Sequence, residues 1–178
     1  SSMSKKALAA DNENRKRLNL SAWLLGRKPP PSIPSGQRAY IVGDIHGCSE
    51  LLDRLLEIII QDAVHGPARR FLVFVGDYVD RGRGSRSVID RLLSLPNEFE
   101  THYLRGNHDQ AMLNFLSDPD SYRVWKTYGA PETLLSYGVR PPKFDDVQAI
   151  RAAHAQFLRA LPEPHLKFLE NLELSWEL

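Results

Sequence analysis

Disulfide bonds cannot form within this chain, because its 178 residues include a single cysteine, Cys48. This excludes the disulfide framework of small secreted proteins and favours a reducing compartment, so we expect a cytoplasmic protein. No apolar run approaches the ~20 residues that a membrane-spanning helix needs. The formal net charge is only +1. The composition therefore gives no reason to expect a membrane or nucleic-acid partner.

A dinucleotide-binding oxidoreductase is also excluded, because no G-x-G-x-x-G pattern follows the first apolar segment. The hydrophobic content of 42% is sufficient for the core of one domain. The prolines between Lys28 and Pro34 lack the N–H groups that a helix or a sheet requires. We therefore predict an N-terminal extension with a proline-rich linker over residues 1–36 and a folded domain over residues 37–178.

Three short apolar segments each run into a glycine that is followed by polar residues. The motifs that follow them are GDIHG at 43–47, GDYVDRG at 76–82 and RGNHD at 105–109. They lie roughly thirty residues apart, about the length of one strand-helix-strand unit. In an open α/β sheet, the loops beyond the carboxyl ends of parallel strands converge on one crevice. The spacing thus predicts an α/β fold with one shared site.

Apolar residues at helical spacing predict helices between and after these motifs. The expected ranges are 49–61, 85–95, 109–116, 147–161 and 165–169. Ser49 is a suitable N-cap for the first helix. Beyond Pro119 the pattern is lost, and we expect an irregular segment that is anchored by aromatic and β-branched side chains.

The polar residues of the three loops form a set of metal ligands. Asp44, His46, Asp77 and Asn107 offer carboxylate, imidazole and amide oxygen, which suit Mn, Fe or Zn. A carboxylate on the middle loop can bridge two metal ions ~3.5–4 Å apart. Without cations, each loop aspartate would repel a phosphate by roughly 3 kcal/mol at ~5 Å and an effective dielectric constant of ~20.

Two further groups fit phosphoryl chemistry. The planar guanidinium of Arg81 suits bidentate binding of a phosphate. His108 is a candidate general acid, and Asp80 can fix its tautomer.

These motifs resemble the three opening motifs of the phosphoprotein phosphatase branch of the calcineurin-like metallophosphoesterases. The resemblance is nearest to the bacterial Ser/Thr protein phosphatases, which share this branch with symmetrical diadenosine tetraphosphate hydrolases. It runs from about Arg38 to the last residue. It implies the α/β/β/α sandwich of the calcineurin-like fold, of which this chain would be the N-terminal part.

The resemblance also implies roles for the ligand set. Asp44 and His46 would bind the first metal ion, Asp77 would bridge, and Asn107 would bind the second. Two divalent ions are implied for the complete enzyme, with Mn preferred over Fe or Zn. A metal-bound hydroxide would be the nucleophile, so no covalent intermediate is expected.

Phosphate binding and proton transfer are assigned by the same resemblance. Arg81 and Asn107 would bind the substrate phosphate, and His108 with Asp80 would protonate the leaving alkoxide. The family more often has Glu where this chain has Asp109, and a glycine-rich turn where it has Ala130 and Pro131.

The end of the chain differs most from the family. Leu172, Leu174, Trp176 and Leu178 alternate with polar residues, which is typical of a half-buried strand. Family members continue into a strand that delivers a histidine ligand. The remaining histidines lie outside the three loops and are expected to be structural or exposed; they are His65, His102, His154 and His165.

We therefore expect the N-terminal portion of a longer enzyme. By itself this portion would hold at most one metal ion, hydrolyse negligibly and self-associate through its open sheet edge. The complete enzyme would act on phosphoproteins as a Ser/Thr phosphatase. Alternatives are a symmetrical diadenosine tetraphosphate hydrolase or another hydrolase of small organic phosphates. A non-catalytic phosphate- or metal-binding module is a further alternative, but the intact motifs favour an active enzyme.

Overall fold

A three-stranded parallel sheet lies at the centre of the fold in the computed structural model, which describes residues 32–178. The strands are β1 (Gln37–Val42), β2 (Arg69–Phe74) and β3 (Glu100–Tyr103), in the order β1-β2-β3. The predicted α/β class with parallel strands is confirmed. Most of the predicted extension over residues 1–36 lies outside the described residues, so this domain boundary stays a prediction.

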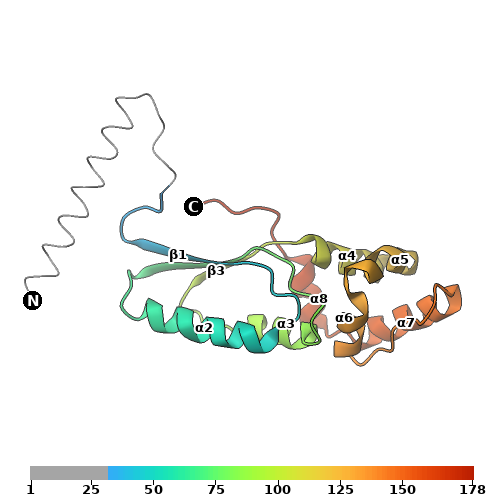
Figure 1. The fold of residues 1–178 in the computed structure, drawn as a ribbon. Helices are drawn as coiled ribbons and strands as arrows, with labels where there is room; N and C mark the ends of the chain where they lie inside the picture. Colours follow the sequence, from blue (N-terminus) through green and yellow to red (C-terminus); the bar gives the residue numbers. More distant parts are fainter. Residues whose placement is uncertain (1–31) are drawn as a thin grey trace, which may run out of the picture. The chain divides into compact units, whose positions relative to one another are not determined.

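Two amphipathic helices connect the strands and lie on the same face of the sheet (Figure 1). They are α2 (Ser49–Ala63) and α3 (Ser85–Leu93). Their apolar stripes are buried together with Leu72 and Phe74 of β2 in one core. Both helices were predicted, but Ser49 does not cap α2. Cys48 takes the N-cap position without a side-chain hydrogen bond, and Ser49 is the first helical residue.

The rest of the domain is helical. Its helices are α4 (Asn107–Ser117), α5 (Tyr122–Trp125), α6 (Ala130–Ser136), α7 (Val147–Ala160) and α8 (Glu163–Glu170), with 3₁₀ turns η1 (Pro119–Ser121) and η2 (Lys126–Tyr128). The prediction of an irregular segment beyond Pro119 was wrong. Its helices are too short to show a helical period, and burial of Tyr122 and Trp125 holds them in place. No helix within residues 32–178 is long and apolar enough to span a membrane.

The predicted C-terminal strand does not form. A single parallel bridge joins Leu104 to Glu173, and Leu174 is 82% exposed. Trp176 instead packs on the ring of Phe71, with the ring centroids 5.4 Å apart. Alternation alone does not make a strand, because the backbone also needs a neighbour to pair with. Residues 32–178 contain one sheet only, so the second sheet of the expected sandwich is not formed by them.

Candidate metal centre

The three polar loops begin where β1, β2 and β3 end, at one edge of the sheet. Backbone hydrogen bonds join the first two loops. The N–H groups of Ile45 and His46 donate to the carbonyl of Asp77 at 3.1 and 2.9 Å, and Gly47 N–H donates to the carbonyl of Tyr78 at 2.9 Å. The convergence of the loops that the motif spacing predicted is therefore present.

Backbone strain is concentrated in these loops. Within residues 32–178, the non-glycine residues with positive φ are His46 (45°), Asp77 (55°), Asp80 (73°) and Arg81 (63°). Each such conformation costs about 1–3 kcal/mol and persists only where the surrounding structure enforces it. All four residues belong to the predicted site, so the strained conformations are confined to its loops.

His46 leaves one ring nitrogen without a hydrogen-bond partner. Its Nδ1 lies 3.0 Å from the carbonyl oxygen of Val79, which can only accept, so Nδ1 carries the proton. The other ring nitrogen, Nε2, is buried without a hydrogen-bond partner and lies 3.7 Å from a carboxylate oxygen of Asp44. An unpaired lone pair beside a carboxylate fits a divalent cation.

Asp77 lies at the centre of the site. Ligand atoms of His46, Asp77 and His108 all lie within 4.8 Å of one another. The carboxylate of Asp77 also accepts a hydrogen bond from the backbone N–H of His108 at 2.9 Å. A Cβ at Gly106 would lie 2.1 Å from this carboxylate, so only glycine allows the close approach. Asn107, the first residue of α4, is exposed and lies between Gly106 and His108 in the chain.

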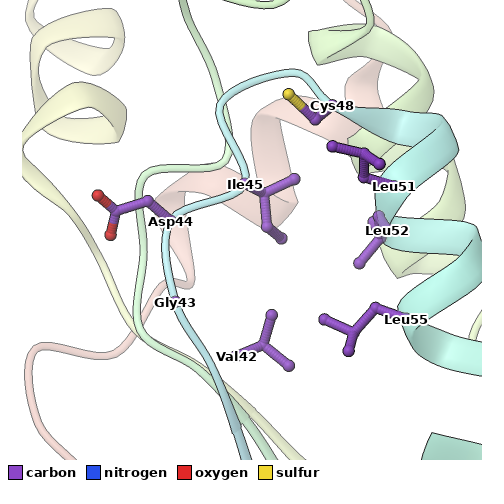
Figure 2. A pocket seen from close by; sticks show the side chains of 8 residues that line it. All are labelled: Val42, Gly43, Asp44, Ile45, Cys48, Leu51, Leu52 and Leu55. Atoms are coloured by element: carbon purple, nitrogen blue, oxygen red, sulfur yellow. The ribbon is translucent and has the colours of Figure 1, made fainter. Parts of the chain in front are cut away.

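Asp44 reaches the site from the first loop. Its backbone also lines an apolar pocket of about 230 Å³ between the end of β1 and α2. Figure 2 shows that the carboxylate of Asp44 points away from the leucines of α2 that line this pocket. The carboxylate of Asp44 is therefore directed away from this pocket, whose apolar lining offers nothing to a phosphate.

His108 and Asp80 form a buried pair. Nδ1 of His108 donates to Oδ2 of Asp80 at 2.9 Å, because a carboxylate can only accept. His108 is 3% exposed and Asp80 is fully buried. The other nitrogen of His108, Nε2, lies 3.4 Å from a guanidinium nitrogen of Arg81. The structure thus brings together the predicted acid, its partner and the predicted phosphate ligand.

Two residues that the sequence marked only as anchors of the segment beyond Pro119 hold Asp80. The indole N–H of Trp125 donates to both carboxylate oxygens at 3.0 and 3.1 Å, and the hydroxyl of Thr133 donates to Oδ1 at 2.7 Å. Burial raises the pKa of Asp80, while the hydrogen bonds from Thr133, His108 and Trp125 lower it, and the net direction is upward. No local pattern marks these contacts, because Trp125 and Thr133 lie 45 and 53 residues away in sequence.

Asp109 ties the second loop to the third. Its buried carboxylate accepts from the backbone N–H groups of Asp77, Tyr78 and Gly106 at 2.8, 3.0 and 2.9 Å. Burial raises its pKa to about 6 despite these hydrogen bonds. In the sequence, Asp109 differs from the Glu expected from the family resemblance only by a shorter side chain. The structure shows that it fixes the backbone of Asp77.

The raised pKa of Asp109 predicts a pH-dependent stability. Between about pH 4 and about pH 6 the folded chain holds a proton that the unfolded chain has lost. The free energy of unfolding should therefore fall as pH rises through this window, by up to about 2–3 kcal/mol. Urea unfolding in EDTA, with Asp109→Asn as the non-titrating reference, measures it. If the wild type instead became more stable than Asp109→Asn as pH rises, the three hydrogen bonds to Asp109 would outweigh its burial.

The other histidines lie outside the site. His165 bonds to the hydroxyl of Tyr137 at 2.9 Å and to Asp90 at 2.8 Å, and His154 lies 3.1 Å from the carbonyl oxygen of Leu116. His102 contacts Glu173 at the C-terminal segment, and His65 is exposed. They are structural or exposed, as the sequence predicted.

Comparison with known proteins supports the motif assignment. A protein-family model described as calcineurin-like phosphoesterase matches residues 38–172. Two relatives are asymmetrical bis(5'-nucleosyl)-tetraphosphatases. That of Geobacillus thermodenitrificans is 34% identical over 106 residues (57% of this chain and 42% of the relative). That of Anoxybacillus flavithermus is 40% identical over 101 residues (54% and 40%).

A symmetrical bis(5'-nucleosyl)-tetraphosphatase of Coxiella burnetii is 31% identical over 180 residues, covering 86% of this chain and 59% of the relative. The chain thus spans less than two thirds of the length of each of these three relatives. Among solved structures, a protein serine/threonine phosphatase from Saccharomyces cerevisiae aligns with 71% of this chain and 36% of its own, at 24% identity and a TM-score of 0.33. That likeness is too low to support an inference.

Proposed function

The chain belongs to the calcineurin-like phosphoesterase family, and from this we propose that the complete protein is a metal-dependent phosphoester hydrolase in which His108 protonates the leaving group. The buried hydrogen bond between His108 and Asp80 is the observation that carries the proposal. It fixes the tautomer of an imidazole that lies 3.4 Å from the guanidinium of Arg81 and near His46 and Asp77, which supports the roles that we propose for them.

The residues present fit divalent metal ions. We propose Asp44, His46, Asp77 and Asn107 as the ligands, and the unpartnered Nε2 of His46 supports this. Mn is our first choice, with Fe or Zn as alternatives. When bound, the ions would neutralise phosphate charge and lower the pKa of a water molecule.

The remaining groups would bind the phosphate and protonate the leaving group. Arg81 would hold two phosphate oxygens in its planar fork, and its position 3.4 Å from Nε2 of His108 directs the phosphate toward that nitrogen. With Nδ1 bonded to Asp80, Nε2 is the nitrogen that would face the substrate. In the imidazolium form it donates its proton to the departing oxygen, and Asp80 balances the positive charge.

We propose phosphoserine and phosphothreonine in proteins as the first substrate class. An alkoxide is a strongly basic leaving group, so it gains most from a positioned general acid. A dinucleoside tetraphosphate is the second candidate, because the relatives with 31–40% identity carry that activity in their names. Its leaving group is a phosphate chain, which needs protonation less.

The test is hydrolysis by the complete protein with Mn²⁺, of a phosphothreonine peptide and of diadenosine tetraphosphate. Faster turnover of the peptide supports the first class, and faster turnover of the tetraphosphate supports the second. If Mn²⁺ binds and neither compound is hydrolysed, the proposal fails and a non-catalytic metal-binding module is favoured. Metal analysis of residues 1–178 alone tests the expectation of at most one bound ion.

A further inference from the structure

The hydroxyl of Thr133 makes three hydrogen-bond contacts around Asp80. It lies 2.7 Å from Oδ1 of Asp80, 2.9 Å from the backbone nitrogen of Asp80 and 3.1 Å from the hydroxyl of Ser85. Thr133 and Ser85 are both fully buried, so water does not compete for these bonds.

The direction of each bond follows from donors and acceptors. A hydroxyl has one hydrogen and two lone pairs. The carboxylate of Asp80 only accepts, so the hydrogen of Thr133 goes to Oδ1. The backbone N–H of Asp80 only donates, and it points to one lone pair of Thr133 and, at 3.2 Å, also to the hydroxyl oxygen of Ser85. The hydrogen of the Ser85 hydroxyl goes to the other lone pair of Thr133. Thr133 therefore fixes Asp80 at its backbone and at its carboxylate.

The carboxylate orientation depends on Thr133. His108 occupies Oδ2 and Thr133 occupies Oδ1, whereas the indole of Trp125 is shared between both oxygens. A shared donor tolerates rotation of the carboxylate, but a donor on Oδ1 alone resists it. Removing the Thr133 hydroxyl would leave Oδ2 free to turn away from His108.

The local sequence places Thr133 for this contact. Gly129 adopts a left-handed φ of 102°, and its carbonyl accepts from the backbone N–H of Arg81 at 3.3 Å. A Cβ at Gly129 would lie 2.6 Å from that nitrogen. Helix α6 then begins at Ala130, with Pro131 in its first turn, where proline is well tolerated. Ala130 and Pro131 thus start the helix that carries Thr133.

We infer that Thr133 is a positioning residue for proton transfer, acting through Asp80 to orient His108. This inference rests on the proposed function for its consequence in catalysis, but the orientation itself can be measured without turnover. The key variant is Thr133→Val, which keeps the side-chain shape and removes the hydroxyl. Thr133→Ser restores the hydroxyl. Thr127→Val is the matched control, because its hydroxyl bonds only to the carbonyl of Val124 in the described residues.

The first measurement is proton NMR of the Nδ1 hydrogen of His108, identified by its loss in His108→Asn. We expect a strongly downfield line in the wild type, in Thr133→Ser and in Thr127→Val, and its shift or loss in Thr133→Val. An unchanged line in Thr133→Val overturns the inference. So does the absence of the line in the wild type, because the bond that Thr133 is inferred to support would then be missing. Thr133→Ala replaces Thr133→Val if the latter does not fold.

The second measurement compares leaving groups in the complete protein. Thr133→Val should lower kcat for a phosphothreonine peptide by about tenfold or more, with little change in KM and a smaller loss for an aryl phosphate. Equal losses on both substrates would indicate a purely structural role and overturn the inference. If the wild type hydrolyses neither substrate, the proposed function fails, while the NMR result still decides whether Thr133 orients His108.

Discussion

Replacing His108 by Asn in the complete protein is expected to lower the turnover of a phosphothreonine peptide by about 10²–10⁴-fold, the usual contribution of a general acid. Asp80→Asn should act in the same direction, because an amide can present its N–H₂ to Nδ1 and reverse the tautomer that the carboxylate enforces. Both residues are buried beside the proposed ligand set, so metal binding should change much less than turnover.

The leaving group provides the control for this prediction. An aryl phosphate releases a weakly basic phenolate that hardly needs protonation, so both variants should retain most of their activity on it. Steady-state kinetics on the two substrates measures the difference. Wild-type rates on the peptide would refute the general-acid role of His108. Comparable losses on both substrates would assign His108 to metal binding instead, which its closeness to His46 and Asp77 makes the relevant alternative.

Replacing His46 or Asp77 by Ala is expected to weaken the binding of Mn²⁺ by more than about 100-fold, since loss of a ligand's supporting partner alone typically costs 10–100-fold. Nε2 of His46 is buried, unpaired and held in place by the Nδ1 bond to Val79, so its loss removes an oriented ligand atom. Calorimetric titration with Mn²⁺ measures the affinity.

His154→Ala is the matched control for the metal prediction. His154 is partly buried and bonded to a backbone carbonyl, but it lies outside the three loops. It should leave Mn²⁺ affinity unchanged. If His154→Ala weakens binding as much as His46→Ala does, ligands outside the three motifs contribute and the proposed set is incomplete.

The chemistry of the site could be predicted from the sequence because each motif is local. A strand, a glycine and the following polar residues occupy a few consecutive positions, and parallel strands bring such loops to one edge. The proximity of His46, Asp77 and His108 follows from this rule, and helices α2 and α3 follow from the helical spacing of their apolar residues. The order of the strands follows from short connections between consecutive units.

Only the tertiary structure shows which side chains hold the second loop and Asp80 in place. Asp109 bonds to backbone groups of a loop 32 and 31 residues earlier in the chain, and Trp125 and Thr133 reach Asp80 from a segment that showed no helical period. A carboxylate that binds backbone N–H groups leaves no trace in the residues it binds, since every residue except proline carries that group. The C-terminal segment shows the converse. The alternating pattern of residues 172–178 is visible in the sequence, but only Glu173 among them pairs with a neighbouring segment, at Leu104. Pairing beyond Glu173 requires an adjacent strand, which the local sequence does not specify.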